Sequence, residues 1–178
     1  MDVVLSETAL QSVNSGLLYH GLKGMKSMKK IVIIDGQGGR MGSLLTEKLK
    51  EVCAARSEKA PHGDPAEPVE LYAIGTNGIA TSAMIKAGAD YGATGENPVL
   101  VNVRDADLII GPIGILCADA LFGEVTPRMA VAVGQSAAEK ILLPVNKCRN
   151  HIVGIPDLSL SALVQDAVHY AEDWLGTH

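Results

Sequence analysis

Residues 29–50 read KKIVIIDGQGGRMGSLLTEKLK, a pattern that indicates a strand, a glycine-rich turn and a helix in immediate succession. The run Ile31–Ile34 is entirely β-branched, which is typical of a strand buried on both faces of a sheet. After the glycines, apolar residues recur at helical spacing on one face: Met41, Leu44, Leu45, Leu49 and Val52. The stretch therefore predicts the first strand–helix unit of a parallel sheet.

The rest of the chain continues to alternate strands with helices. The predicted strands are Leu71–Ile74, Leu108–Ile110 and Ile141–Leu143, with further candidates at Val99–Val103 and His151–Ile155. The predicted helices are Ile79–Ala87, about Ile113–Leu121, one that begins at Thr126-Pro127, and a last one capped by Ser159. Loops are expected at 56–68 and at Gly92–Pro98. This alternation predicts an α/β protein: a single Rossmann-like domain with an open, mostly parallel sheet and helices on both faces.

The domain is expected to span residues 29–178. Residues 1–28 mix serine, glycine, asparagine and glutamine with isolated leucines and show no regular period. A disordered N-terminal extension is the expected interpretation of this segment, and a docking tail is the alternative.

Composition and charge argue against several classes of function. The net charge is −5 and no stripe of lysine and arginine stands out, so no nucleic-acid partner is expected. No apolar run reaches the roughly 18 residues that a membrane span needs. The three cysteines lack a CxxC spacing and the histidines are scattered, which favours a cytoplasmic protein without a metal site. A mean hydropathy of +0.20 suggests that apolar surface is buried between subunits of a homo-oligomer.

The strongest chemical signal is the turn that follows the first strand. Its candidate ligand-contacting residues are Asp35, Gly36, Gln37, Gly38, Gly39, Arg40, Met41 and Gly42. Glycines let backbone N–H groups approach an anion closely, and the helix that follows adds unpaired N–H groups and the positive end of its dipole. In open parallel sheets, ligands bind at this carboxyl edge. The turn therefore predicts a phosphate-binding site, and the alternative is a tight turn without a ligand.

Three residues near this turn allow more than one interpretation. Asp35 could face a ribose hydroxyl, hold Arg40 or bind Mg²⁺, or it could simply cap the turn. Thr76 and Asn77 follow the second strand, where a dinucleotide-binding protein usually places a carboxylate for the ribose. A hydroxyl and an amide could still bind a ribose or its phosphate, although Asn77 could equally be a helix N-cap.

Further candidates follow later strands. Gly111, Pro112, Ile113 and Gly114 come directly after a buried strand, where their backbone could approach a ligand or shape the entry into a helix. Asn146 follows another strand and could line the same edge. Glu96 is the one candidate for a general acid or base, with a solvated loop glutamate as the alternative. The catalytic residues otherwise stay unknown at this point.

Two resemblances rest on these motifs. The spacing of Gly36, Gly39 and Gly42, with the sequence Gly-Arg-Met-Gly, resembles the NADP-binding loop of dihydrodipicolinate reductases. From Lys29 to about Ala171, the chain resembles a family of short bacterial proteins described as domain of unknown function 3842. The stretches that carry this resemblance are Ile34–Gly39, Gly75–Asn77, Ala80–Met84, Lys86–Asp90, Gly92–Asn97 and Gly111–Gly114. The family implies a fold but no reaction, and Arg40 and Met41 replace the third glycine and the isoleucine of its usual loop.

Two hypotheses for the function follow. In the first, the Gly36–Gly42 loop binds a phosphate-bearing nucleotide, with NAD(P) as one candidate cofactor, in a small oxidoreductase or a redox or nucleotide sensor. In the second, the chain is a non-catalytic ligand-sensing or interaction module for a phosphosugar, a mononucleotide or a partner protein. Length argues against an enzyme, because one domain leaves no separate substrate domain, although a second subunit could supply another wall.

Overall fold

A computed structural model describes residues 28–59, 66–145, 152–156 and 158–178. The expected extension at residues 1–28 lies outside the described residues except for its last position, and so do Asn146 and His151.

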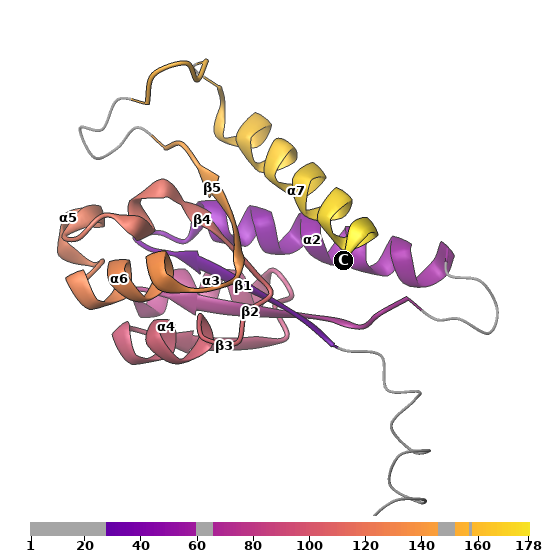
Figure 1. Cartoon of the computed structure of the whole chain (residues 1–178), viewed down its shortest axis with the longest axis horizontal. Helices are drawn as coiled ribbons and strands as arrows, with labels where there is room; N and C mark the ends of the chain where they lie inside the picture. The colour runs from indigo at the N-terminus through magenta and orange to yellow at the C-terminus, as the bar shows by residue number, and fades with distance from the viewer. Residues whose placement is uncertain (1–27, 60–65, 146–151, 157) are drawn as a thin grey trace, which may run out of the picture.

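The strands form one parallel sheet of five strands in the order β3-β2-β1-β4-β5 (Figure 1). They are β1 (Lys29–Asp35), β2 (Val69–Gly75), β3 (Tyr91–Thr94), β4 (Leu108–Pro112) and β5 (Glu139–Leu143). The chain first moves outward from β1 to β3 and then returns to the other side of β1. This reversal puts the topological switch point between β1 and β4, where open α/β sheets bind ligands. The predicted α/β, Rossmann-like sheet is thus confirmed.

Helices cover both faces of the sheet (Figure 1). One layer consists of α2 (Arg40–Lys59), α3 (Gly78–Lys86) and α7 (Leu160–Thr177), and the other of α4 (Glu96–Asn102) and α6 (Pro127–Gln135). In β1, Ile31 and Ile33 pack against the first layer, whereas Val32 and Ile34 pack against the second. Because both faces of β1 are covered, its sequence is apolar at every one of these positions.

Two short elements connect β4 to α6. They are the 3₁₀ helix η1 (Ile113–Leu116) and the single turn α5 (Ala120–Gly123). The predicted helix at about Ile113–Leu121 is therefore wrong, because Cys117 is extended and Asp119 and Leu121 adopt left-handed backbone angles that a right-handed helix does not contain. The expected caps of the two following helices are confirmed: the Thr126 hydroxyl accepts from the Met129 amide and Ser159 accepts from the Ala162 amide, each at 3.2 Å.

The region around β3 and α4 also differs from the prediction. The expected strand at Val99–Val103 is wrong: α4 occupies it, and Val99 and Val103 are buried one helical turn apart while Val101 is exposed. The expected loop at Gly92–Pro98 instead contains β3 and the start of α4. β3 lies at the sheet edge and is mostly exposed, so it lacks the apolar run by which the inner strands were recognised.

Two further boundaries differ. α2 continues through Lys59, so the first residues of the expected loop 56–68 are helical. Within the described residues 152–156, no strand forms, so the candidate strand at His151–Ile155 is wrong for the part that the structure describes.

Candidate functional site

The turn between β1 and α2 is held from inside by Asp35. Its carboxylate accepts a hydrogen bond from the Gly36 amide through Oδ1 at 2.8 Å and from the Gly42 amide through Oδ2 at 2.6 Å. The side chain is only 6% exposed. The two bonds close the turn over the first residues of α2, where the helix dipole also favours a carboxylate. Of the roles that the sequence left open for Asp35, capping the turn is therefore the one that the geometry shows.

The four glycines of the turn have different surroundings. A Cβ at Gly36 or at Gly42 would come within 3 Å of side chains packed on the turn. Gly39 has a φ of +67°, and a Cβ there would lie 2.6 Å from the Ala80 Cα in α3. At Gly38, by contrast, a Cβ would meet nothing within 4 Å among the described residues. Packing thus accounts for three of the glycines, and Gly38 is the one that faces open space.

The backbone amides of the turn differ in the same way. Those of Gly36, Gln37, Gly39 and Gly42 donate to acceptors within the protein. Three other amides have no protein acceptor in the described part of the chain. They are the N–H groups of Gly38, in the turn, and of Arg40 and Met41, at the start of α2. Unpaired amides at a helix start, together with the positive end of the dipole, favour an anion.

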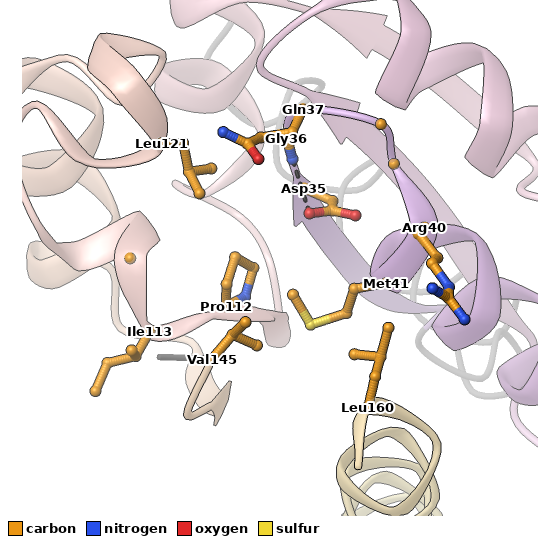
Figure 2. A pocket seen from close by; sticks show the side chains of 13 residues that line it. Asp35, Gly36, Gln37, Arg40, Met41, Pro112, Ile113, Leu121, Val145 and Leu160 are labelled. Atoms are coloured by element: carbon orange, nitrogen blue, oxygen red, sulfur yellow. Dashed lines mark hydrogen bonds between the residues drawn. The ribbon is translucent and has the colours of Figure 1, made fainter. Parts of the chain in front are cut away.

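These amides border a cavity of about 450 Å³ at the switch point between β1 and β4 (Figure 2). The residues that line it are Asp35, Gly36, Gln37, Gly38, Gly39, Arg40, Met41, Pro112, Ile113, Gly114, Leu121, Val145 and Leu160. Figure 2 shows the side chains of Met41, Pro112, Val145 and Leu160 gathered around the open centre, with Arg40 at one side. The cavity therefore combines one polar wall, made by the turn, with an apolar remainder.

On its other side, toward β2, the turn contacts a carboxylate of the protein itself. Oε2 of Glu124 accepts hydrogen bonds from the Gln37 amide at 2.9 Å, from the Asn77 side-chain amide at 2.9 Å and from the Thr76 hydroxyl. Burial raises the pKa of Glu124, but the hydrogen bonds from Thr76, Gln37 and Asn77 outweigh it and hold this pKa below the usual value of 4.5. The carboxylate is thus ionised at neutral pH.

Thr76 and Asn77 therefore stabilise a protein group and do not line the cavity. Asn77 also caps α3, since its Oδ1 accepts a hydrogen bond from the Ala80 amide at 2.9 Å. Its side-chain amide donates in addition to the Gln37 carbonyl at 3.0 Å, which ties the end of β2 to the glycine turn.

The later sequence candidates fall into two groups. Pro112, Ile113 and Gly114 line the cavity, whereas Gly111 does not: a Cβ there would overlap the carbonyl of the neighbouring strand β1. Glu96 lies at the start of α4 and away from the cavity lining. Its carboxylate accepts a hydrogen bond from the Thr126 hydroxyl and pairs with the Arg128 guanidinium, both at 2.6 Å, so it connects α4 to α6.

The comparison with protein families gives one match. Residues 30–175 match the model of a family described as a domain of unknown function, DUF3842. The chain belongs to this family. The match confirms the resemblance drawn from the sequence blocks, and it carries no activity with it. No curated protein and no solved structure matches the chain significantly. The likeness of the glycine loop to that of dihydrodipicolinate reductases stays a prediction.

Four residues at the site of this DUF3842 chain are not among the sequence candidates: Leu121, Glu124, Val145 and Leu160. Val145 lies two residues after the end of β5. Glu124 and Leu121 come from the left-handed turn after η1, and no local pattern marks either as a neighbour of the glycine loop. Leu160 could have been found, because a helix that follows a parallel strand begins at the carboxyl edge of the sheet.

Other classes of site have little support in the described residues of this DUF3842 chain. No group of three or more His, Cys, Asp or Glu side chains there could hold a metal ion. Among the described helices, none combines the length and apolar character that crossing a bilayer requires. Ile79 and Val131 are exposed by 71% and 54%, which is compatible with a covered interface, but self-association stays a prediction.

Proposed function

We propose that this DUF3842 chain binds a small ligand through a phosphate group at the start of α2. The observation that carries the proposal is the set of three backbone amides, of Gly38, Arg40 and Met41, that have no acceptor in the described protein and border the cavity. The dipole of a 20-residue helix and the exposed Arg40 guanidinium add positive potential at the same point.

The rest of the cavity indicates what the phosphate is attached to. Its volume of about 450 Å³ lies within the range of small-molecule pockets. Met41, Pro112, Val145 and Leu160 give it an apolar wall, which suits the flat face of a nucleobase better than the hydroxyls of a sugar. The geometry thus favours a mononucleotide over a phosphosugar.

A dinucleotide fits this conformation less well. In a dinucleotide-binding fold the ligand extends over both sides of the glycine loop, and the ribose of one nucleotide half lies at the end of β2. Here Leu121 and Glu124 pack against Gly36 on that side. NAD(P) is therefore kept as a comparison ligand, and a nucleoside monophosphate is the ligand we expect.

The proposed role is binding and sensing, which corresponds to the second of the two hypotheses from the sequence. Asp35 and Arg40 are the ionisable groups among the described lining residues. Both carboxylate oxygens of Asp35 already accept amide hydrogen bonds, which restrains it from acting as a general base. The guanidinium of Arg40 is a planar cation with several N–H donors, which suits anion binding.

Calorimetric titration of the full chain with AMP, ribose 5-phosphate, NAD and NADP tests the proposal. We expect AMP to bind most tightly. Gly38→Val should abolish this binding, because it adds bulk to the cavity wall at a position where a Cβ meets no described atom within 4 Å, so the fold should tolerate it. Gly176→Val is the matched control, since Gly176 also faces open space but lies in the last turn of α7. Absence of binding of all four ligands at about millimolar concentration would contradict the proposal.

A further inference from the structure

We infer that the Gln37 amide, the Thr76 hydroxyl and the Asn77 side-chain amide form a second anion subsite, which Glu124 fills in the ligand-free protein. The ligand group for this subsite is a second phosphate attached to the first, as in a nucleoside diphosphate. The inference rests on the proposed function, because the first phosphate is the one held at the start of α2.

The donor set is that of an anion site. Three donors from two parts of the chain, the glycine turn and the end of β2, converge on one oxygen, Oε2 of Glu124. They are a backbone amide, a hydroxyl and a side-chain amide, which together offer hydrogen bonds without bringing a positive charge. A phosphate oxygen can accept the same bonds, so the glutamate carboxylate stands where an external anion would bind.

The two subsites are adjacent. Gln37 supplies the amide of the second subsite, and Gly38, the next residue, supplies an amide of the first. Gln37 has a φ of 53°, which is a left-handed backbone angle. Consecutive amides in such a turn form a concave anion-binding surface. Two phosphates joined by one oxygen match neighbouring positions of this kind.

Glu124 closes the second subsite by charge and by volume. Its carboxylate is ionised at neutral pH, because the hydrogen bonds that it accepts hold its pKa below the usual value, so it repels a second phosphate. Leu121, three residues earlier, covers Gly36 on the same side: a Cβ at that glycine would lie 2.8 Å from its Cδ1. Removal of the carboxylate therefore opens the subsite to a charged group.

The segment that carries Glu124 is suited to such a release. Asp119, Leu121 and Phe122 have φ values of 61°, 55° and 60°, a region that L-residues adopt at a cost. Phe122 is 96% exposed and Gly123 has no contact at its Cβ position, so little packing holds the tip of this turn. The bonds to Glu124 hold the turn against the loop, and a phosphate that replaces the carboxylate frees the segment.

Calorimetry of AMP and ADP with the full-length wild type, Glu124→Ala, Glu124→Gln and Glu172→Ala tests the inference. Wild type should bind ADP no more tightly than AMP. Glu124→Ala should bind ADP about ten-fold or more tightly than wild type does, with little change for AMP, as expected for new charge-assisted hydrogen bonds. Glu124→Gln keeps the volume and removes the charge, so its affinity for ADP should lie between those of wild type and Glu124→Ala. It also provides the test if the alanine variant unfolds. Glu172→Ala, on exposed α7 surface, controls for net charge.

Each outcome decides the matter. A gain for ADP in the Glu124 variants and not in the Glu172 variant supports the second subsite. Unchanged or weaker ADP binding by a folded Glu124 variant, while wild type binds AMP, overturns the subsite and leaves the proposed function intact. Failure of every protein to bind either nucleotide overturns both.

Discussion

The glycine turn has two sides that differ in what they face. Toward β4 and β5 it presents the unpaired amides of Gly38, Arg40 and Met41 to a cavity of about 450 Å³. Toward β2 it presents the Gln37 amide to the carboxylate of Glu124. The same short sequence therefore has amides without a described acceptor on one side and an amide paired with a carboxylate on the other, and the proposed function places the phosphate on the first side.

This difference shows that glycine content does not measure ligand binding. Gly36, Gly39 and Gly42 are required by the close approach of other parts of the protein, and Gly38 is the one at which a Cβ would meet no described atom within 4 Å. The number of glycines in the loop is therefore not by itself a sign of ligand binding.

The largest expected effect separates Gly39 from Gly38. Gly39→Val forces a β-branched residue to a φ of +67° and brings its Cβ within 2.6 Å of the Ala80 Cα. We expect a loss of about 3 kcal/mol in the free energy of unfolding, measured with urea. Gly38→Val should change it by about 0.5 kcal/mol or less. Equal losses of unfolding free energy for the two variants would show that packing does not distinguish Gly39 from Gly38.

A smaller effect is expected at the residue that holds the turn together. Asp35→Asn keeps one carbonyl oxygen as an acceptor but places an amide nitrogen against the other of the two backbone N–H groups that donate hydrogen bonds to Asp35. The unfolding free energy should fall by about 2 kcal/mol, the cost of one unmade hydrogen bond to a charged group. The matched variant Asp119→Asn, in the turn before Glu124, should leave stability nearly unchanged. A neutral result for Asp35→Asn would contradict its role in closing the turn.

The smallest stability effect concerns the occupied side and depends on pH. Because the pKa of Glu124 is lower in the folded protein than its usual value of 4.5, its ionised form stabilises the fold above that pH. This contribution is lost as the pH falls through the folded pKa. At pH 7, Glu124→Gln should cost about 1 kcal/mol, since the group is partly exposed and solvent screens it. The difference between variant and wild type should shrink as the pH falls below 4.5 and through the folded pKa. A difference that stays constant with pH would contradict the assignment.

Local patterns in the sequence were sufficient to predict most of the fold. The β-branched run Ile31–Ile34 and the capped helices after Thr126 and Ser159 were recognised because burial and capping leave a periodic or positional signature. The strand expected at Val99–Val103 is a helix because three valines at alternate positions do not by themselves distinguish a short helix from a strand. The edge strand β3 was missed because its exposed residues carry no apolar pattern.

The site was predicted only in part, for a different reason. The turn at Gly36–Met41 and the segment Pro112–Gly114 were found because each directly follows a buried strand, and strand ends meet at one edge. Glu124 could not be predicted because it reaches the loop through a left-handed turn. Leu121 and Phe122, which form this turn, are residues that rarely adopt left-handed angles, so the sequence does not indicate it.

The central claim, that a phosphate binds at the start of α2, is tested most directly by amide NMR of the ¹⁵N-labelled full chain titrated with AMP. The account predicts the largest shifts at the backbone amides of Gly38, Arg40 and Met41, with the amide of Gly176 at the far end of α7 unmoved. Gly38→Val should remove these shifts and leave the rest of the spectrum in place. The claim is contradicted if saturating AMP leaves those three amides unshifted, or if the shifts gather instead around Arg104 and Arg128 on the α4–α6 surface.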